Sequence, residues 1–160
     1  MLLWMVGGAV LAVWAVFRDP TFDYRLLIVG VLLPDVVDVW FGGARVMHSI
    51  TASVVLLAIV MLATIGRRAA RKRWLALPIG TFLHLVFDGA FANTTVFWWP
   101  FTGVGFDDAR LPVAERGLVN VVLEVLGVAI IVYLWRRFGL ADPRRRRRFL
   151  REGRLVDQRR

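Results

Sequence analysis

The chain has 160 residues, of which 58% are hydrophobic, with no cysteine and a net charge of +9. Soluble domains are about 45–50% apolar, so this composition argues against a water-soluble globular protein. The absence of cysteine excludes disulfides and thiolate metal ligands. We therefore expect an all-α protein, a polytopic membrane helical bundle with about five transmembrane helices.

Five apolar segments are predicted to cross the membrane, at about residues 2–17, 24–41, 47–66, 74–91 and 117–135. The first lacks the basic start and cleavage site of a secretory signal, so we expect it to be retained. Residues 92–116 form the one long connection, whose VFWWPF sequence (96–101) is typical of a membrane interface. Residues 1–142 are thus predicted to be a transmembrane domain with the functional site, and 143–160 a basic cytoplasmic tail.

Basic residues are concentrated in two places. Five of the 21 Lys and Arg lie in RRAARKR (67–73), and eleven lie from Arg136 onward. The positive-inside rule makes both segments cytoplasmic, which leaves the N-terminus and residues 92–116 outside. We expect a multi-pass protein of the cell inner (plasma) membrane, with its C-terminus in the cytoplasm. The tail is expected to contact anionic lipids rather than nucleic acid.

Ionisable side chains inside the apolar segments gather near their predicted outer ends. A carboxylate near the membrane core costs at least ~2.5–3.5 kcal/mol, so several of them require a partner. A divalent cation offsets several negative charges at once, and imidazole with carboxylate suits Zn²⁺, Mn²⁺ or Fe²⁺ better than Ca²⁺. Ion pairs with Arg45, Arg110 or Arg116 are the alternative. The residues concerned are Asp35, Asp38, His48, His84, Asp88, Asn120 and Glu124.

Spacing supports a shared site. Asp35 and Asp38 are three residues apart, and His84 and Asp88 are four apart, so each pair can share one helix face. Bundles build metal sites in their cores from such pairs on facing helices. Pro34 is expected to kink the second segment just before Asp35, because proline cannot donate to the carbonyl of Gly30.

The ordered motifs LLPDVVD (32–38), MHS (47–49), GTFLHLVFDGAF (80–91) and FWWPF (97–101) resemble the YdjM-like family of membrane-bound metal-dependent hydrolases. The resemblance covers roughly residues 28–101. It implies that Asp35, His48, His84 and Asp88 are metal-site residues. By analogy, the family is distantly similar to zinc-dependent phospholipases C and related phosphoesterases.

These observations predict a membrane-embedded metal-dependent hydrolase, of phosphatase or phosphodiesterase type, acting on a lipid phosphate or phosphodiester. Zn²⁺ or Mn²⁺ is the expected cofactor. Asp38 or Glu124 is expected to be a further ligand or the general base, and Arg45 to hold a phosphate oxygen. A metal-binding transporter or a non-catalytic membrane partner protein is the alternative, and a serine hydrolase at Ser49 is a weaker third.

Overall fold

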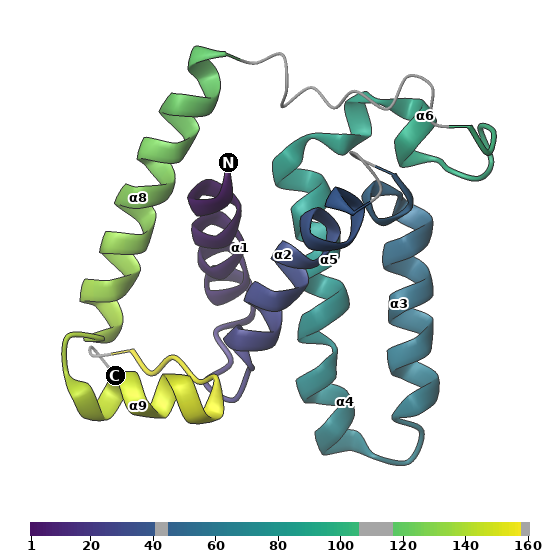
Figure 1. The fold of residues 1–160 in the computed structure, drawn as a ribbon. Coiled ribbons are helices and arrows are strands. Elements are labelled where there is room, and N and C mark those ends of the chain that lie inside the picture. The colour runs from purple at the N-terminus through teal and green to yellow at the C-terminus, as the bar shows by residue number, and fades with distance from the viewer. Residues whose placement is uncertain (41–44, 106–116, 158–160) are drawn as a thin grey trace.

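A computed structural model describes residues 1–40, 45–105 and 117–157 (Figure 1). No strand occurs within these ranges, so the predicted all-α class is confirmed. The predicted apolar segments correspond to helices α1, α2, α3, α5 and α8. The α-helices are α1 (Leu2–Phe17), α2 (Tyr24–Val39), α3 (Ile50–Ala63), α4 (Arg68–Trp74), α5 (Ala76–Asp88), α6 (Thr94–Phe97), α8 (Leu118–Phe138) and α9 (Pro143–Glu152), with 3₁₀ turns η1 (Val46–His48) and η2 (Ala90–Ala92).

The long helices lie side by side, while α9 lies across one end of the bundle (Figure 1). The basic helix α4 is at that same end. The turn η1 and the short helix α6 are at the opposite end, together with the start of α1. Both basic segments therefore share one end of the molecule, and Arg110 and Arg116 lie outside the described residues.

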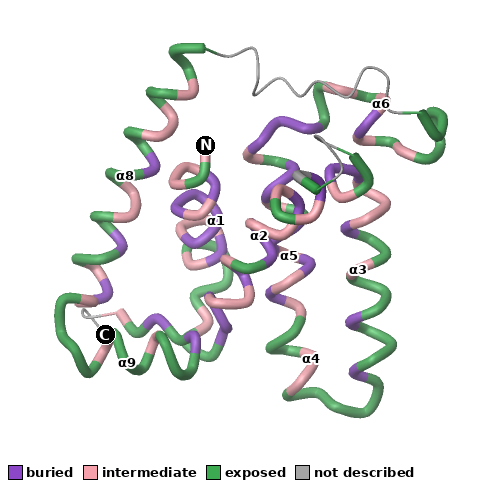
Figure 2. The backbone as a smooth tube through the Cα atoms, in the orientation of Figure 1, coloured by how far each residue is buried: buried purple, intermediate pink, exposed green. Residues whose placement is uncertain are grey.

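One described helix, α8, is long and apolar enough to cross a bilayer, and 11% of its most apolar stretch is buried in the protein. Helices α1 and α3 are apolar but shorter. Figure 2 shows the exposed residues along α8 and α3. The largest apolar exposures on α8 include Leu118 (83%) and Val125 (63%), so this helix presents apolar side chains outward.

Two glycines bring α2 and α5 into close contact. A Cβ on Gly30 would overlap the carbonyl of Leu77, and one on Gly80 would overlap the carbonyl of Leu27. Small residues at such crossings allow helix backbones to approach closely. The two helices make the most extensive contact of any pair of described elements, and this contact positions the site described below.

The basic tail is folded onto the bundle rather than extended from it. Leu155 is buried in the core beside Tyr24 and Phe138. The Gly153 carbonyl accepts a hydrogen bond from the Tyr24 amide (2.8 Å). Gly153 has φ +73°, and a side chain there would also overlap the Asp23 carboxylate. The division of the chain at residue 142 stays a prediction, but Phe149, Gly153 and Leu155 pack against the bundle.

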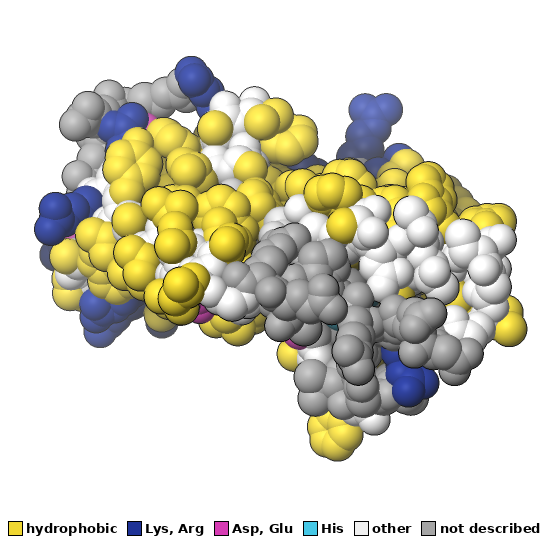
Figure 3. Space-filling view, turned by 90° about the horizontal axis from the view of Figure 1, so that it is seen from above, with side chains coloured by type: hydrophobic (Ala, Val, Ile, Leu, Met, Phe, Trp, Pro, Cys, Tyr) yellow, Lys and Arg dark blue, Asp and Glu magenta, His cyan; other side chains and the backbone are white. Residues whose placement is uncertain are grey.

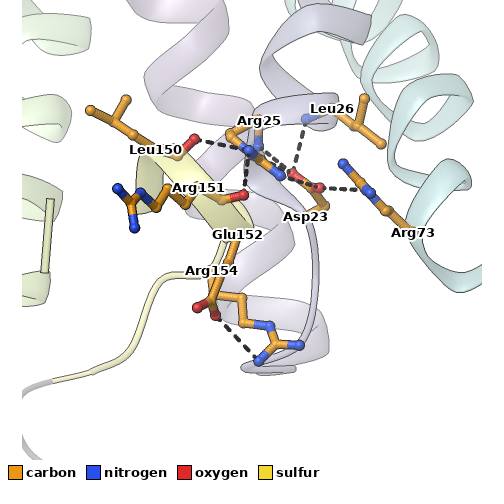
Figure 4. A network of polar contacts seen from close by, with 8 residues as sticks. All are labelled: Asp23, Arg25, Leu26, Arg73, Leu150, Arg151, Glu152 and Arg154. Atoms are coloured by element: carbon orange, nitrogen blue, oxygen red, sulfur yellow. Dashed lines mark hydrogen bonds and ion pairs between the residues drawn. The ribbon is translucent and has the colours of Figure 1, made fainter. Parts of the chain in front are cut away.

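Asp23 is the centre of this contact (Figure 4). Its carboxylate caps α2 by accepting from the Arg25 and Leu26 amides, and it also pairs with the guanidinium groups of Arg25 and Arg73. Arg25 in turn donates to the carbonyls of Leu150 and Arg151 (2.9 and 2.8 Å). Burial raises the pKa of the Asp23 carboxyl, but the hydrogen bonds and charges of these partners outweigh it and lower that pKa.

Candidate metal centre

Local structure explains the position of each donor. His48 ends the turn η1 and directly precedes the cap of α3, where Ser49 accepts a hydrogen bond from the Ala52 amide (3.1 Å). Asp35 lies in the last turns of α2, and His84 lies one turn before the end of α5. The Ser49 hydroxyl also donates to the Val46 carbonyl (2.7 Å). Because both functions belong to the helix cap, the histidine–serine motif has a structural reason that does not involve nucleophilic serine.

Asp35, His48 and His84 come together at the end of the bundle opposite the basic segments. The Nε2 atoms of His48 and His84 are 3.2 Å apart. Asp35 Oδ1 is 3.5 Å from Nε2 of His48 and 3.6 Å from Nε2 of His84. His84 is fully buried and His48 nearly so, whereas 48% of the Asp35 side chain is exposed. The cluster is thus closed on the histidine side and open on the aspartate side.

The other nitrogen of each imidazole is held by an acceptor. Nδ1 of His84 is 2.7 Å from the Val31 carbonyl, and Nδ1 of His48 is 2.7 Å from Asp38 Oδ2. Both acceptors lack a proton to give, so in the neutral rings Nδ1 carries the hydrogen and Nε2 carries a lone pair. Backbone carbonyls and carboxylates behind ligating histidines are the usual orienting partners in metal sites.

The three donors fit a divalent cation. In a tetrahedral zinc site with bonds of about 2.0–2.1 Å, neighbouring ligand atoms are ~3.4 Å apart, close to the 3.2, 3.5 and 3.6 Å observed. When both rings are neutral, two lone pairs face each other across 3.2 Å and repel, and neither ring donates to the other through Nε2. A cation between them removes this conflict and offsets the charge of Asp35. These three residues could hold a metal ion.

Asp38 is placed behind His48 instead of among the three donors. Besides the His48 ring, its carboxylate accepts hydrogen bonds from the Arg45 amide (2.8 Å) and the Met47 amide (3.4 Å). Asp38 therefore lies behind His48 Nδ1, and its role as a ligand or base stays a prediction. The amide of Arg45 contributes to this arrangement, and its exposed side chain lies at the same end of the molecule.

Asp88 and Glu124 have different surroundings. The Asp88 carboxylate is buried and acts electrostatically on both His48 and His84, so it lies at the site, although it is not one of the three closest donors. Glu124 instead accepts hydrogen bonds from the Leu3 and Trp4 amides (3.2 and 3.3 Å) at the start of α1. This contact joins α8 to α1, and the catalytic role of Glu124 stays a prediction.

Sequence reasoning missed the Val31 carbonyl. A backbone carbonyl cannot be recognised from the residue type that carries it. Gly30 and Gly80, however, are small residues on two apolar segments, where a close approach of the helices could be predicted. Their contact brings α2 close enough to α5 for His84 to reach Val31.

Comparison of the chain with protein-family models, with curated proteins and with solved structures finds no match.

Proposed function

We propose that this protein is a multi-pass membrane protein that hydrolyses a phosphate ester of a lipid with a divalent metal ion, Zn²⁺ or Mn²⁺. The observation that carries the proposal is the set of three donor atoms of Asp35, His48 and His84, each 3.2–3.6 Å from the next. Catalytic zinc sites use three protein ligands and leave a position for water or substrate. The resemblance to the YdjM-like family agrees with this proposal.

Exposed apolar helix surfaces support the membrane location. Helix α8 is apolar yet mostly unburied, whereas the core helix of a soluble protein would be covered by its neighbours. At the metal-site end, Phe91, Trp98 and Phe101 are exposed at 58%, 48% and 82%, as in an interfacial aromatic belt. Basic residues on α4 and α9 lie at the opposite end, which would be cytoplasmic, and α9 would contact anionic lipids there.

Helix length supports a site at the depth of lipid headgroups. Helices α2, α3 and α5 have 16, 14 and 13 residues, or roughly 20–24 Å, which is less than the ~30 Å hydrocarbon core. In this orientation all three have their outer ends at the metal donors. Irregular backbone at membrane depth is tolerated where it lines a polar cavity. A lipid phosphate would reach the exposed side of Asp35 from the adjacent headgroup layer.

The residues have distinct roles in the proposed reaction. Asp35, His48 and His84 hold the ion, while Asp38 and the Val31 carbonyl keep both Nε2 atoms aimed at it. When bound, such an ion polarises the phosphoryl oxygen and lowers the pKa of a coordinated water. Asp88 provides either a further ligand or the carboxylate that accepts the proton of the attacking water. The Arg45 guanidinium, at the outer end, contributes positive charge toward a phosphate oxygen.

The proposal is tested by removing metal from purified protein in nanodiscs, restoring Zn²⁺ or Mn²⁺, and measuring phosphate release from phosphatidic acid. We expect activity to return with one metal ion or two per chain and to be abolished by His48→Ala or His84→Ala. Asp19→Asn, which removes a carboxylate at the opposite end, is the matched control and should retain activity. Metal uptake into proteoliposomes without phosphate release would identify a transporter and contradict the proposal.

A further inference from the structure

An apolar groove begins beside the metal donors. It is formed by α1 (residues 12–17), α3 (residues 50–57) and α5 (residues 78–83), and its volume is about 470 Å³. Ligand pockets commonly have volumes of ~300–1,000 Å³. The groove is distinct from the metal cluster because none of the three donors lines it.

The groove runs away from the metal cluster along the bundle. Its near end is formed by Ile50, two residues after His48, and by Leu83, the neighbour of His84. From Ile50 to Leu57 the helix rises ~10 Å. The far end, at Phe17 and Pro78, lies toward the basic segments. Figure 3, seen from the metal-site end, shows hydrophobic side chains over much of that end of the molecule.

Ser53 is the polar exception among the described residues that line the groove. Ser53 is buried, with 5% of the residue exposed, and its hydroxyl oxygen has no hydrogen-bond partner among the described residues. By contrast, the hydroxyls of Thr64 and Thr81 donate to carbonyls of their own helices. Leaving a buried hydroxyl unsatisfied is unfavourable, so Ser53 points to a ligand oxygen. It lies five residues after His48 in the chain and in the first turn of α3.

We propose that the groove binds one acyl chain of an ester-linked glycerolipid whose phosphate lies at the metal cluster, with the Ser53 hydroxyl donating to the ester carbonyl of that chain. This inference rests on the proposed function and specifies its substrate class. The order of these features along the protein matches the order of groups in such a lipid. The metal cluster would bind the phosphate, the Ser53 hydroxyl would meet the ester carbonyl, and the apolar groove would hold the acyl chain. A free phosphate or a short ester would use the metal cluster alone.

The test compares a long-chain phosphatidic acid with para-nitrophenyl phosphate in metal-loaded protein. Ala12→Phe, which fills the groove from α1, should raise KM for phosphatidic acid at least tenfold and leave hydrolysis of para-nitrophenyl phosphate within twofold. Ala15→Phe adds the same side chain at an exposed position of α1 outside the groove and should change neither. Ser53→Ala should raise KM about two- to tenfold for the ester-linked lipid and have no effect on its ether-linked analogue.

Binding is measured separately from turnover with a photoactivatable acyl-chain phosphatidic acid, mapped by mass spectrometry. Labelling of residues 50–57 and 78–83 that Ala12→Phe abolishes and Ala15→Phe preserves supports the groove. Equal labelling in both variants, or equal labelling by a phosphate-free diacylglycerol, identifies ordinary bilayer lipid and overturns it. If both esters are hydrolysed and KM for phosphatidic acid does not depend on the length of its acyl chains, the groove inference is wrong and the proposed function stands. If neither ester is hydrolysed, the proposed function fails, and the labelling result alone decides the groove.

Discussion

The two imidazoles of the candidate metal centre owe their orientation to atoms that do not touch the ion. Asp38 and the Val31 carbonyl each accept from Nδ1, which leaves Nε2 as the donor atom on both rings. Such partners typically change metal affinity 10–100-fold when they are lost. The residues behind the ligands are therefore as testable as the ligands themselves.

Asp38→Asn should lower Zn²⁺ affinity by about 10–100-fold while the protein stays folded. The amide keeps the size of the side chain and one oxygen acceptor, but it removes the negative charge that supports the Nδ1 hydrogen of His48. Competition with a chromogenic chelator measures the affinity, and the melting temperature checks the fold. An unchanged zinc affinity would show that Asp38 does not position His48.

Asp88→Asn separates the two roles left open for this residue. If the carboxylate is a ligand, zinc affinity and turnover fall together. If it is the proton acceptor, the metal content stays at the wild-type level and kcat falls by about 10²–10⁴-fold. Elemental analysis beside single-turnover kinetics distinguishes these results, and wild-type values in both measurements would exclude Asp88 from the site.

At the scale of elements, the crossing of α2 and α5 couples stability to the metal centre. Gly80→Ala places a methyl group against the backbone of α2, where neither helix can move without displacing Val31 from His84. We expect destabilisation of about 1–3 kcal/mol, as in other overpacked contacts, together with weaker zinc binding. Thermal unfolding and metal titration measure the two effects.

Gly8→Ala is the matched control for this change. Its Cβ would meet the Phe87 ring, a side chain that can turn aside, and not a backbone. It should therefore cost less than Gly80→Ala and leave zinc affinity intact. Equal losses in the two variants would contradict the coupling.

The docking of the tail on α2 should depend on pH through Asp23. The usual pKa of this carboxyl, 3.8, is lowered in the folded protein, so its interactions stabilise the fold above about pH 4–5 and are lost as the pH falls through the lower, folded value. Asp23→Asn should reduce the melting temperature on the order of 5 °C at pH 7. The difference from wild type should shrink below pH 3.8, and a difference that grows there would refute this account.

The helices could be predicted from the sequence because their apolar runs are long and are separated by charged or turn residues. The three donor residues could also be predicted, because an ionisable residue in an apolar run is costly. Their roles could not be predicted. Asp38 and Asp35 are alike in sequence, and whether each meets Nδ1 or Nε2 of His48 depends on how η1 folds before α3. Similarly, the contact of Glu124 with the Leu3 and Trp4 amides could not be predicted, because no spacing within α8 indicates it.

At the scale of the whole molecule, the distribution of charge predicts its orientation. Single cysteines introduced at residues 69 and 150 should be protected from a membrane-impermeant thiol reagent in intact cells, whereas one at residue 103 should be labelled. The native chain has no cysteine, so the background is zero. Labelling at 69 or 150 with protection at 103 would reverse the orientation.

The contact between Tyr24 and Gly153 has a consequence for the order in which the molecule is completed. Its partners are separated by 129 residues, so at roughly 5–20 residues per second the ribosome needs ~6–26 s to make the second after the first. During that interval the Arg25 guanidinium at the start of α2 lacks the carbonyls of Leu150 and Arg151 as hydrogen-bond acceptors. A chain that ends before Leu150 never forms these hydrogen bonds. The start of α2 thus differs between a finished molecule and a prematurely terminated one.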